Sequence, residues 1–191
     1  MRVVVTEFVS VDGVIEDPGG SENFDRGGWA FQFERGDEGD KFKFDEVIEA
    51  EAQLLGRVTY QGFADAWPDR EDEAGFAERM NSMPKYVVSS TIEDPTWTNT
   101  TVLNGDVAEE VGRLKQGDGG DLLIAGSAQL VHALTDAGLV DEYRLMVFPL
   151  VIGAGKRLWS ETGAPAALEL VDSKPVGPDG VVILTYRPKG S

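Results

Sequence analysis

The sequence predicts a three-layer α/β fold, in which helices cover both faces of a mostly parallel, twisted sheet with antiparallel strands at its C-terminal edge. Two observations lead to this prediction. Over the first two thirds of the chain, short apolar strands alternate with helical patterns, which is typical of parallel strands joined by helices. The last third instead contains strand patterns separated by turns. We expect one domain over residues 1–191, because no repeat or linker divides the chain.

Apolar, β-branched runs predict the strands of the parallel part. These strands are expected at 2–9, 54–55, 86–88, 102–103 and 122–125. Helical patterns lie between or after them, at 39–52, 60–66, 72–83, 106–115 and 126–137. Two helices have candidates for N-terminal caps. Thr59 can cap the segment at 60–66, and Asp106 with Glu109 forms a capping-box pattern.

The last third predicts strands at 143–150, 168–173 and 181–187. The sequence Gly177-Pro178-Asp179-Gly180 is a strong turn signal, so the last two strands are expected to form a hairpin. Near the N-terminus, segment 16–28 is rich in glycine, aspartate and proline and is predicted to be a loop. Trp29, Phe31 and Phe33 follow it, as an aromatic cluster that either packs on the core or lines a pocket.

Composition excludes several kinds of site. The chain has no cysteine and one histidine, His132, which rules out disulfides, thiolate zinc sites, cysteine nucleophiles and multi-histidine metal sites. We therefore expect no metal, and we assign His132 no role. The formal net charge of −17 argues against nucleic acid or an anionic membrane as a partner, because both need a basic face.

The N-terminus has a strand pattern rather than the apolar core of a signal peptide. No apolar run reaches the roughly 18 residues that a membrane span needs. We therefore expect a cytoplasmic protein. Because its overall charge is negative, an anionic ligand would need a local positive site made of a few arginines and helix N-termini.

Three strand-to-helix junctions contain residues suited to binding phosphate. The first is Leu55-Gly56-Arg57-Val58-Thr59-Tyr60. Gly56 lets a ligand approach the backbone, and the following helix directs its free N–H groups at the junction. Arg57 adds a charged fork and Thr59 adds a hydroxyl. Taken alone, the pattern also fits a helix cap beside a surface arginine.

The second junction, Val88-Ser89-Ser90-Thr91, places three hydroxyls after a buried strand, although a polar turn has the same composition. The third, Ile124-Ala125-Gly126-Ser127-Ala128-Gln129, exposes backbone where a pyrophosphate could meet a helix N-terminus, and close helix–strand packing is its alternative. All three junctions are expected at one edge of the parallel sheet. A ligand with two or three phosphates that spans this edge would explain them together.

In combination these motifs resemble the dihydrofolate reductase superfamily. The resemblance is carried by Val11–Ile15, Leu55–Tyr60, Tyr86–Ser90 and Leu123–Ser127, and it covers nearly the whole chain. Leu139–Tyr143 and Pro149–Gly155 favour the branch similar to the C-terminal reductase domain of the riboflavin-biosynthesis deaminase–reductase. The resemblance implies an NADPH-dependent reductase of a small heterocyclic or carbonyl-type substrate. A dinucleotide- or flavin-binding protein of the same fold without this activity is the alternative.

The resemblance also implies which residues hold NADPH across the carboxyl ends of the strands. They are Phe8, Ile15, Gly56, Arg57, Thr59, Ser89, Ser90, Gly126, Ser127, Ala128 and Gln129. Arg57 and Ser89-Ser90 would hold the 2′-phosphoadenosine end, and Thr59 with the 126–129 turn would hold the pyrophosphate. Phe8 and Ile15 would flank the nicotinamide, under a lid formed by the 16–28 loop.

Two acidic residues are candidates for the chemistry. Folate-reducing members place a carboxylate on the first helix, where this chain offers Asp40, Asp45, Glu46 and Glu49; spacing back from Gly56 favours Asp40. Asp12 corresponds to a polar residue of the riboflavin branch, with a role in the turn as its alternative. The arginine that grips the tail of folate has no clear counterpart, so folate is not expected as the substrate. A homodimer is expected through the strand at 144–150, which is apolar on both sides.

Overall fold

The computed structural model describes residues 1–161 and 163–190. Its strands are β1 (Arg2–Ser10), β2 (Ala52–Gly56), β3 (Lys85–Val88), β4 (Thr100–Leu103), β5 (Asp121–Ile124), β6 (Glu142–Phe148), β7 (Leu168–Val176) and β8 (Val181–Pro188). Its helices are α1 (Gly36–Glu49), α2 (Arg57–Ala66), α3 (Phe76–Ser82), α4 (Val107–Gln116) and α5 (Ala128–Asp136). A short 3-10 helix, η1, covers Trp29–Gln32.

The eight strands of the described part form one sheet, in the order β4-β3-β2-β5-β1-β6-β8-β7. In this spatial order, all strands from β4 across the sheet to β6 run parallel to their neighbours. The strand β8 runs antiparallel to both β6 and β7. The predicted mostly parallel sheet with an antiparallel edge is therefore confirmed. The reversal of direction begins at β8, because β6 still pairs in parallel with β1.

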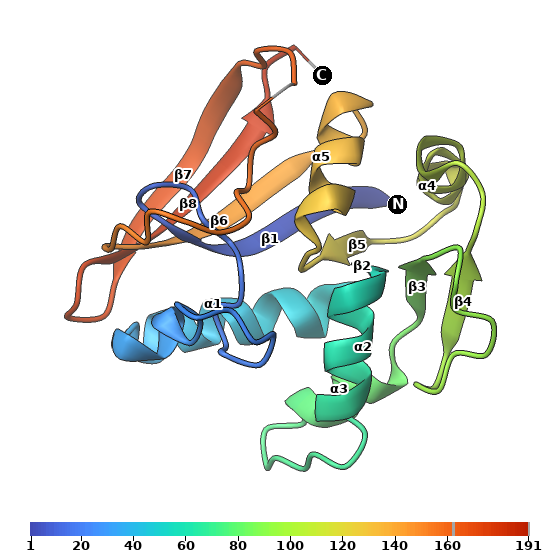
Figure 1. Cartoon of the computed structure of the whole chain (residues 1–191), viewed down its shortest axis with the longest axis horizontal. Helices are drawn as coiled ribbons and strands as arrows, with labels where there is room; N and C mark the ends of the chain where they lie inside the picture. Colours follow the sequence, from blue (N-terminus) through green and yellow to red (C-terminus); the bar gives the residue numbers. More distant parts are fainter. Residues whose placement is uncertain (162, 191) are drawn as a thin grey trace.

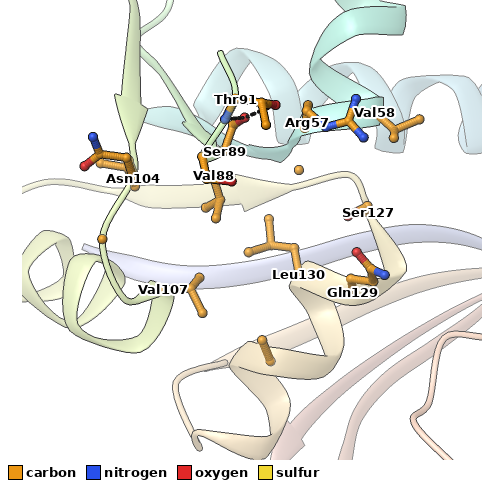
Figure 2. Close-up of a pocket in the computed structure, with 15 residues that line it drawn as sticks. Arg57, Val58, Val88, Ser89, Thr91, Asn104, Val107, Ser127, Gln129 and Leu130 are labelled. Atoms are coloured by element: carbon orange, nitrogen blue, oxygen red, sulfur yellow. Dashed lines mark hydrogen bonds between the residues drawn. The ribbon is translucent and has the colours of Figure 1, made fainter. Parts of the chain in front are cut away.

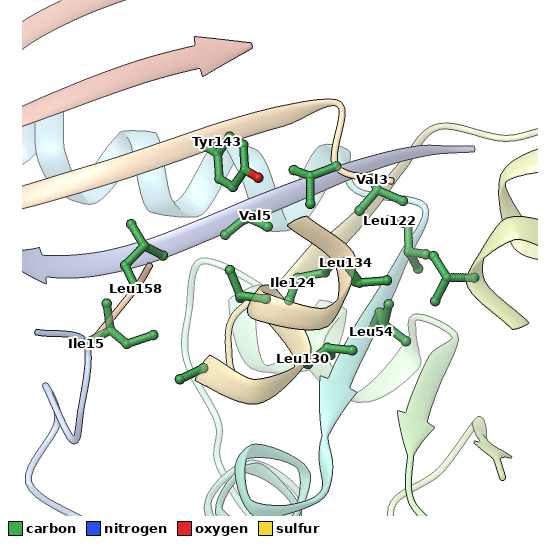
Figure 3. Packing of buried hydrophobic residues seen from close by; sticks show 14 of the residues in the cluster. Val3, Val5, Ile15, Leu54, Leu122, Ile124, Leu130, Leu134, Tyr143 and Leu158 are labelled. Atoms are coloured by element: carbon green, nitrogen blue, oxygen red, sulfur yellow. The ribbon is translucent and has the colours of Figure 1, made fainter. Parts of the chain in front are cut away.

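Helices cover both faces of the sheet, as Figure 1 shows, so the three layers are also confirmed. Side chains from α4 and α5 pack on one face and those from α1, α2 and α3 on the other. The consecutive residues Val3, Val4 and Val5 of β1 are all buried, because successive side chains of a strand enter the two covered faces in turn. Figure 3 shows Val3 and Val5 in the cluster beneath α5, with Leu130 and Leu134.

The starts of three helices lie three or four residues from their predicted positions. The first helix spans Gly36–Glu49 rather than 39–52, because the chain is already extended as β2 from Ala52. The second starts at Arg57 with Gly56 as its N-cap, so the prediction that Thr59 caps it is wrong. Thr59 instead lies in the first turn. The third starts at Phe76 rather than at 72, because residues before it form a turn whose Asp72 carboxylate accepts from the N–H groups of Phe76 and Ala77.

The N-cap predicted at Asp106 is confirmed, since its carboxylate accepts from the N–H groups of Ala108 and Glu109, each at 3.0 Å. The Glu109 carboxylate faces Arg113 instead of completing a capping box. The predicted hairpin between β7 and β8, with its turn at Gly177–Gly180, is also confirmed.

The aromatic cluster after the 16–28 loop divides between the two predicted outcomes. Trp29 is buried and contacts Phe148 of β6 edge to face, and Phe33 approaches the same ring. Phe31 is 76% exposed and, together with Phe33, lines a pocket of about 310 Å³. The apolar character of β6 on both sides also has an internal explanation, because β6 lies between β1 and β8 and is covered on both faces. The homodimer that this pattern favoured stays a proposal.

Candidate functional site

A groove of about 540 Å³ lies at the carboxyl edge of the parallel strands, where Figure 2 shows side chains converging from several elements. The described residues that line it are Gly56, Arg57, Val58, Val88, Ser89, Ser90, Thr91, Leu103, Asn104, Gly105, Val107, Ser127, Gln129, Leu130 and Ala133. They come from the three junctions predicted from the sequence and from a fourth, the β4–α4 connection. The expected meeting of the three junctions at one sheet edge is thus confirmed.

Two helices begin at this groove without a side-chain cap. Gly56 is the N-cap of α2 and Ser127 is the N-cap of α5, and neither makes a side-chain cap hydrogen bond in the described structure. The first N–H groups of such helices have no intrahelical acceptor and carry the positive end of the helix dipole. The groove therefore offers an anion two neighbouring sets of backbone donors. At α4 the equivalent donors are already used by Asp106.

The two uncapped helix ends meet because glycines stand at the point of contact. The Gly56 N–H donates to the Gly126 carbonyl over 3.3 Å. A Cβ on Gly56 would lie 2.3 Å from Ser127 Oγ and 3.1 Å from the Ser127 nitrogen. Gly126 has a φ of 90°, which side chains disfavour, and a Cβ there would lie 2.9 Å from Thr59 Oγ1. Both positions require glycine.

Arg57 supplies the positive charge of the groove. It is the one charged residue among the described lining residues. Its side chain is exposed at the start of α2, and its Nη1 donates to Gln61 Oε1 over 3.0 Å. In a chain of net charge −17, the groove is thus a local site where an anion meets positive charge.

The three hydroxyl residues after β3 all line the groove, but they differ in their hydrogen bonds and exposure. Ser89 Oγ accepts from the N–H groups of Thr91 and Ile92, both at 3.1 Å, so it stabilises the polar turn named as the alternative for this tripeptide. Ser90 is exposed in the groove lining. The sequence did not predict that Asn104 and Gly105 line the groove. The signal that could have indicated them is a polar Asn-Gly pair between a predicted strand and a capped helix.

Some of the predicted cofactor residues lie outside the lining of the groove. Gly126 is in the turn before α5, and Thr59 and Ala128 are in the first turns of α2 and α5. Phe8 packs edge to face on Phe148, with ring centroids 5.3 Å apart, and Ile15 is buried in the cluster that also contains α5. Their place beside a nicotinamide stays a prediction.

Asp12 holds two loops together. Its carboxylate accepts from Ser10 Oγ at 2.7 Å and from the N–H groups of Ile152 at 3.0 Å and Gly153 at 2.8 Å. Burial acts to raise the pKa of Asp12, but these hydrogen bonds outweigh it and lower the pKa to about 2. A carboxylate that is ionised and already accepts these hydrogen bonds is better suited to stabilising the turn than to donating a proton.

Burial separates the acidic candidates of α1. Asp40 is exposed and pairs with Arg35, with Nε and Oδ1 2.5 Å apart. Glu46 is buried and accepts from Thr6 Oγ1 of β1 at 2.7 Å and from Lys43 Nζ at 2.5 Å. The chemical role predicted for Asp40 stays a prediction, and its surroundings do not favour it. Glu46 is the α1 carboxylate whose side chain is seen to reach β1.

Sequence reasoning missed Glu7, an acid in the middle of β1. Its side chain is buried, with the residue 7% exposed. Burial raises the pKa of Glu7 to about 8, although the Lys43 charge and a hydrogen bond from the Gly126 backbone act to lower it. The available signal was a charged residue inside an otherwise apolar run. Since burial depends on which elements cover the strand, the pattern alone did not single it out.

His132 Nε2 lies 2.9 Å from the Arg157 carbonyl, so its ring ties α5 to the loop after β6. Among the residues that the structure describes, no group of three or more histidine or acidic side chains is placed to hold a metal ion. No helix in the same described ranges is both long enough and apolar enough to cross a bilayer.

Comparison with known proteins bears on this fold and groove. Residues 1–182 match the family model of the RibD C-terminal domain. The chain belongs to the RibD C-terminal domain family. Two relatives are the uncharacterised proteins YyaP and YwjB of Bacillus subtilis, each 28% identical to this chain. The match to YyaP covers 99% of this chain and 96% of YyaP, and the match to YwjB covers 92% of each.

Solved structures of the same fold include a Shewanella sp. PV-4 protein assigned to riboflavin biosynthesis, with a TM-score of 0.77, 20% identity and 99% of each chain covered. A pyrimidine reductase-like protein of Corynebacterium diphtheriae has a TM-score of 0.69 and 12% identity, covering 100% of this chain and 92% of its own. Dihydrofolate reductase of Enterococcus faecalis, complexed with NADP(H) and RAB-propyl, has a TM-score of 0.62 and 17% identity, with 98% of this chain and 96% of the reductase covered. These matches establish the dihydrofolate-reductase-like fold for this RibD C-terminal family member.

Proposed function

We propose that this protein is an NADPH-dependent reductase of a small heterocyclic or carbonyl-type substrate, acting as a single cytoplasmic domain that forms a homodimer. The observation that carries the proposal is the meeting of two uncapped helix N-termini and Arg57 in one groove at the sheet edge. Backbone donors of this kind suit a pyrophosphate, and an exposed arginine beside them suits a further phosphate group. Membership of the RibD C-terminal domain family supports the choice of a reductase.

The residues of the groove fit the parts of NADPH. Gly56 lines the groove, and Gly56 and Gly126 together let the starts of α2 and α5, where the pyrophosphate would bind, lie close to each other. Ser127 and Gln129 line the groove at the start of α5, and Thr59 and Ala128 lie in the first turns of α2 and α5. Arg57 after β2, with Ser90 after the neighbouring strand β3, would hold the 2′-phosphoadenosine end, while Ser89 stabilises the turn.

When bound, NADPH supplies the hydride for the reduction. The share of this chain is to hold the cofactor, orient it toward β1 and exclude water from the reacting end. Phe8 on β1 and Ile15 after it are the residues proposed beside that end. The loop at 16–28 is proposed as the cover, and Asp17 gives it a defined shape by accepting from the N–H groups of Ser21, Glu22 and Phe24.

Calorimetric titration with NADPH and NADH tests the proposal. We expect NADPH to bind more tightly than NADH, because NADH lacks the 2′-phosphate. The variant Arg57→Ala removes a charge-assisted contact worth roughly 1.5–3 kcal/mol, so its affinity for NADPH should fall roughly 10- to 150-fold with little change for NADH. Arg113→Ala is the matched control, since Arg113 lies on exposed α4 and pairs with Glu110 outside the groove.

If the wild type bound NADPH and NADH with equal affinity, Arg57 would not be the residue that recognises the 2′-phosphate. Binding of FMN in place of either nicotinamide cofactor would favour the flavin-binding alternative. NADPH binding without oxidation by a panel of pyrimidines, pterins and carbonyl compounds would leave a dinucleotide-binding protein that lacks the proposed activity.

A further inference from the structure

Glu7 lies where β1 loses its neighbour on one side. In the described structure β1 pairs with β5 from Arg2 to Val5, and beyond that point it pairs with β6 as far as Ser10. The strand β5 ends at Ile124, and the chain then turns through Gly126 into α5. Because Glu7 lies two residues beyond Val5, the last residue of β1 that pairs with β5, it stands beside the turn that leads into α5.

The carboxylate of Glu7 is incompletely satisfied. Its Oε1 is buried and has no hydrogen-bond partner among the described residues. The Gly126 backbone N–H acts on this carboxylate and lowers its pKa. Gly126 belongs to the same turn that would present backbone donors to the pyrophosphate of a dinucleotide. An ionised Glu7 and an anionic ligand would thus compete for the same end of α5.

Charged groups from two other segments act on the pKa of Glu7. Lys43 and Glu46 come from α1, and Glu22 comes from the 16–28 loop. Lys43 is already paired with Glu46, with Nζ and Oε1 2.5 Å apart. The one positive side chain in this group is therefore shared with a second buried carboxylate, which limits how far it can neutralise Glu7.

On the basis of the proposed function, we propose that the dinucleotide binds over the neutral form of Glu7, so that the protein carries a proton on this side chain when the cofactor is in place. A neutral carboxyl group adds no negative charge beside the pyrophosphate and leaves the α5 N-terminus to the ligand. An ionised one would repel the pyrophosphate within a poorly solvated site, where charge interactions are strong. Glu7 would then decide the pH range in which the cofactor binds.

The test is NADPH affinity as a function of pH, measured by calorimetry from about pH 7 to about pH 9.5. Below this range the phosphate of the cofactor itself titrates, with a second pKa of about 6. For the wild type we expect affinity to fall with rising pH, approaching about tenfold per pH unit once Glu7 ionises. In Glu7→Gln, a neutral side chain of the same shape, we expect tight binding and no such fall.

Glu22→Gln provides a second variant on an exposed loop, so it does not depend on the interior tolerating a substitution. Because the Glu22 charge acts to raise the pKa of Glu7, its removal should move the decline in affinity to lower pH. Circular dichroism at each pH checks that the variants stay folded. If wild type and Glu7→Gln lose affinity in parallel, or if neither does, Glu7 has no such role although NADPH binds. If the wild type binds no NADPH at any pH, the proposed function itself fails.

Discussion

At Asp12, three hydrogen-bond donors converge on one carboxylate and join the first loop to the segment after β6. We predict that Asp12→Ala lowers the free energy of unfolding by roughly 1.5–3 kcal/mol at neutral pH, the usual contribution of a hydrogen bond to a charged group. Urea unfolding of both proteins measures this. NADPH affinity should change little, because Asp12 lies outside the groove lining.

The sign of the pH dependence follows from the lowered pKa of Asp12, about 2 against an ordinary value of 3.8. Stability from a carboxylate of this kind is present above its unfolded pKa and is lost as the pH falls through its folded pKa. The difference between wild type and Asp12→Ala should therefore shrink as the pH is lowered from 3.8 toward 2. Unchanged stability with lost turnover would instead restore Asp12 as a catalytic residue.

At the scale of elements, the site depends on how closely the β2–α2 and β5–α5 junctions approach. We predict that Gly56→Ala lowers the melting temperature and weakens NADPH binding, because its Cβ would lie 2.3 Å from Ser127 Oγ and 3.1 Å from the Ser127 backbone nitrogen. The hydroxyl can rotate away, but the backbone must move, and that displaces the start of α5.

Gly62→Ala is the control on the same helix. A Cβ on Gly62 meets nothing within 4 Å among the described residues, and alanine is favoured over glycine inside a helix by about 1 kcal/mol. This variant should raise the melting temperature and leave NADPH affinity unchanged. If both variants behaved alike, close contact between the two junctions would not be what positions the groove.

At the scale of the whole molecule, the net charge of −17 opposes the approach of any anion. We predict that the association rate constant for NADPH rises when ionic strength is raised from about 0.01 M to about 0.15 M, because the screening length falls from about 30 Å to about 8 Å. Stopped-flow mixing measures the rate. The association rate constant of Arg57→Ala should also rise with ionic strength, since the long-range electrostatic field is produced by the charges of the whole surface. A rate that falls with salt would mean that the local positive site, rather than the net charge, governs the encounter.

The groove was predictable in outline because its parts are local in sequence. Gly56-Arg57 and Gly126-Ser127 each combine a strand end, a flexible turn and a helix start, and parallel strands bring such ends to one edge. The acidic side chains were not predictable in the same way. Spacing favoured Asp40, yet helix packing leaves Asp40 at the surface and buries Glu46. Because β1 pairs with β5 only as far as Val5, Glu7 has no strand neighbour on that side.

Turn chemistry and hydrophobic periodicity act over a few residues. The sequence alone therefore determined the fold class, the change from parallel to antiparallel strands and the residues at the strand ends. Helix ends shifted where a competing element began, as at Ala52 and at Asp72. Burial of a charge is different, because it depends on elements far apart in sequence that remove water from one side chain. Only tertiary packing therefore determined the surroundings of each carboxylate. Asp12 accepts hydrogen bonds from the loop after β6. Glu46 is buried and paired with Lys43, and Glu7 is buried beside the turn into α5.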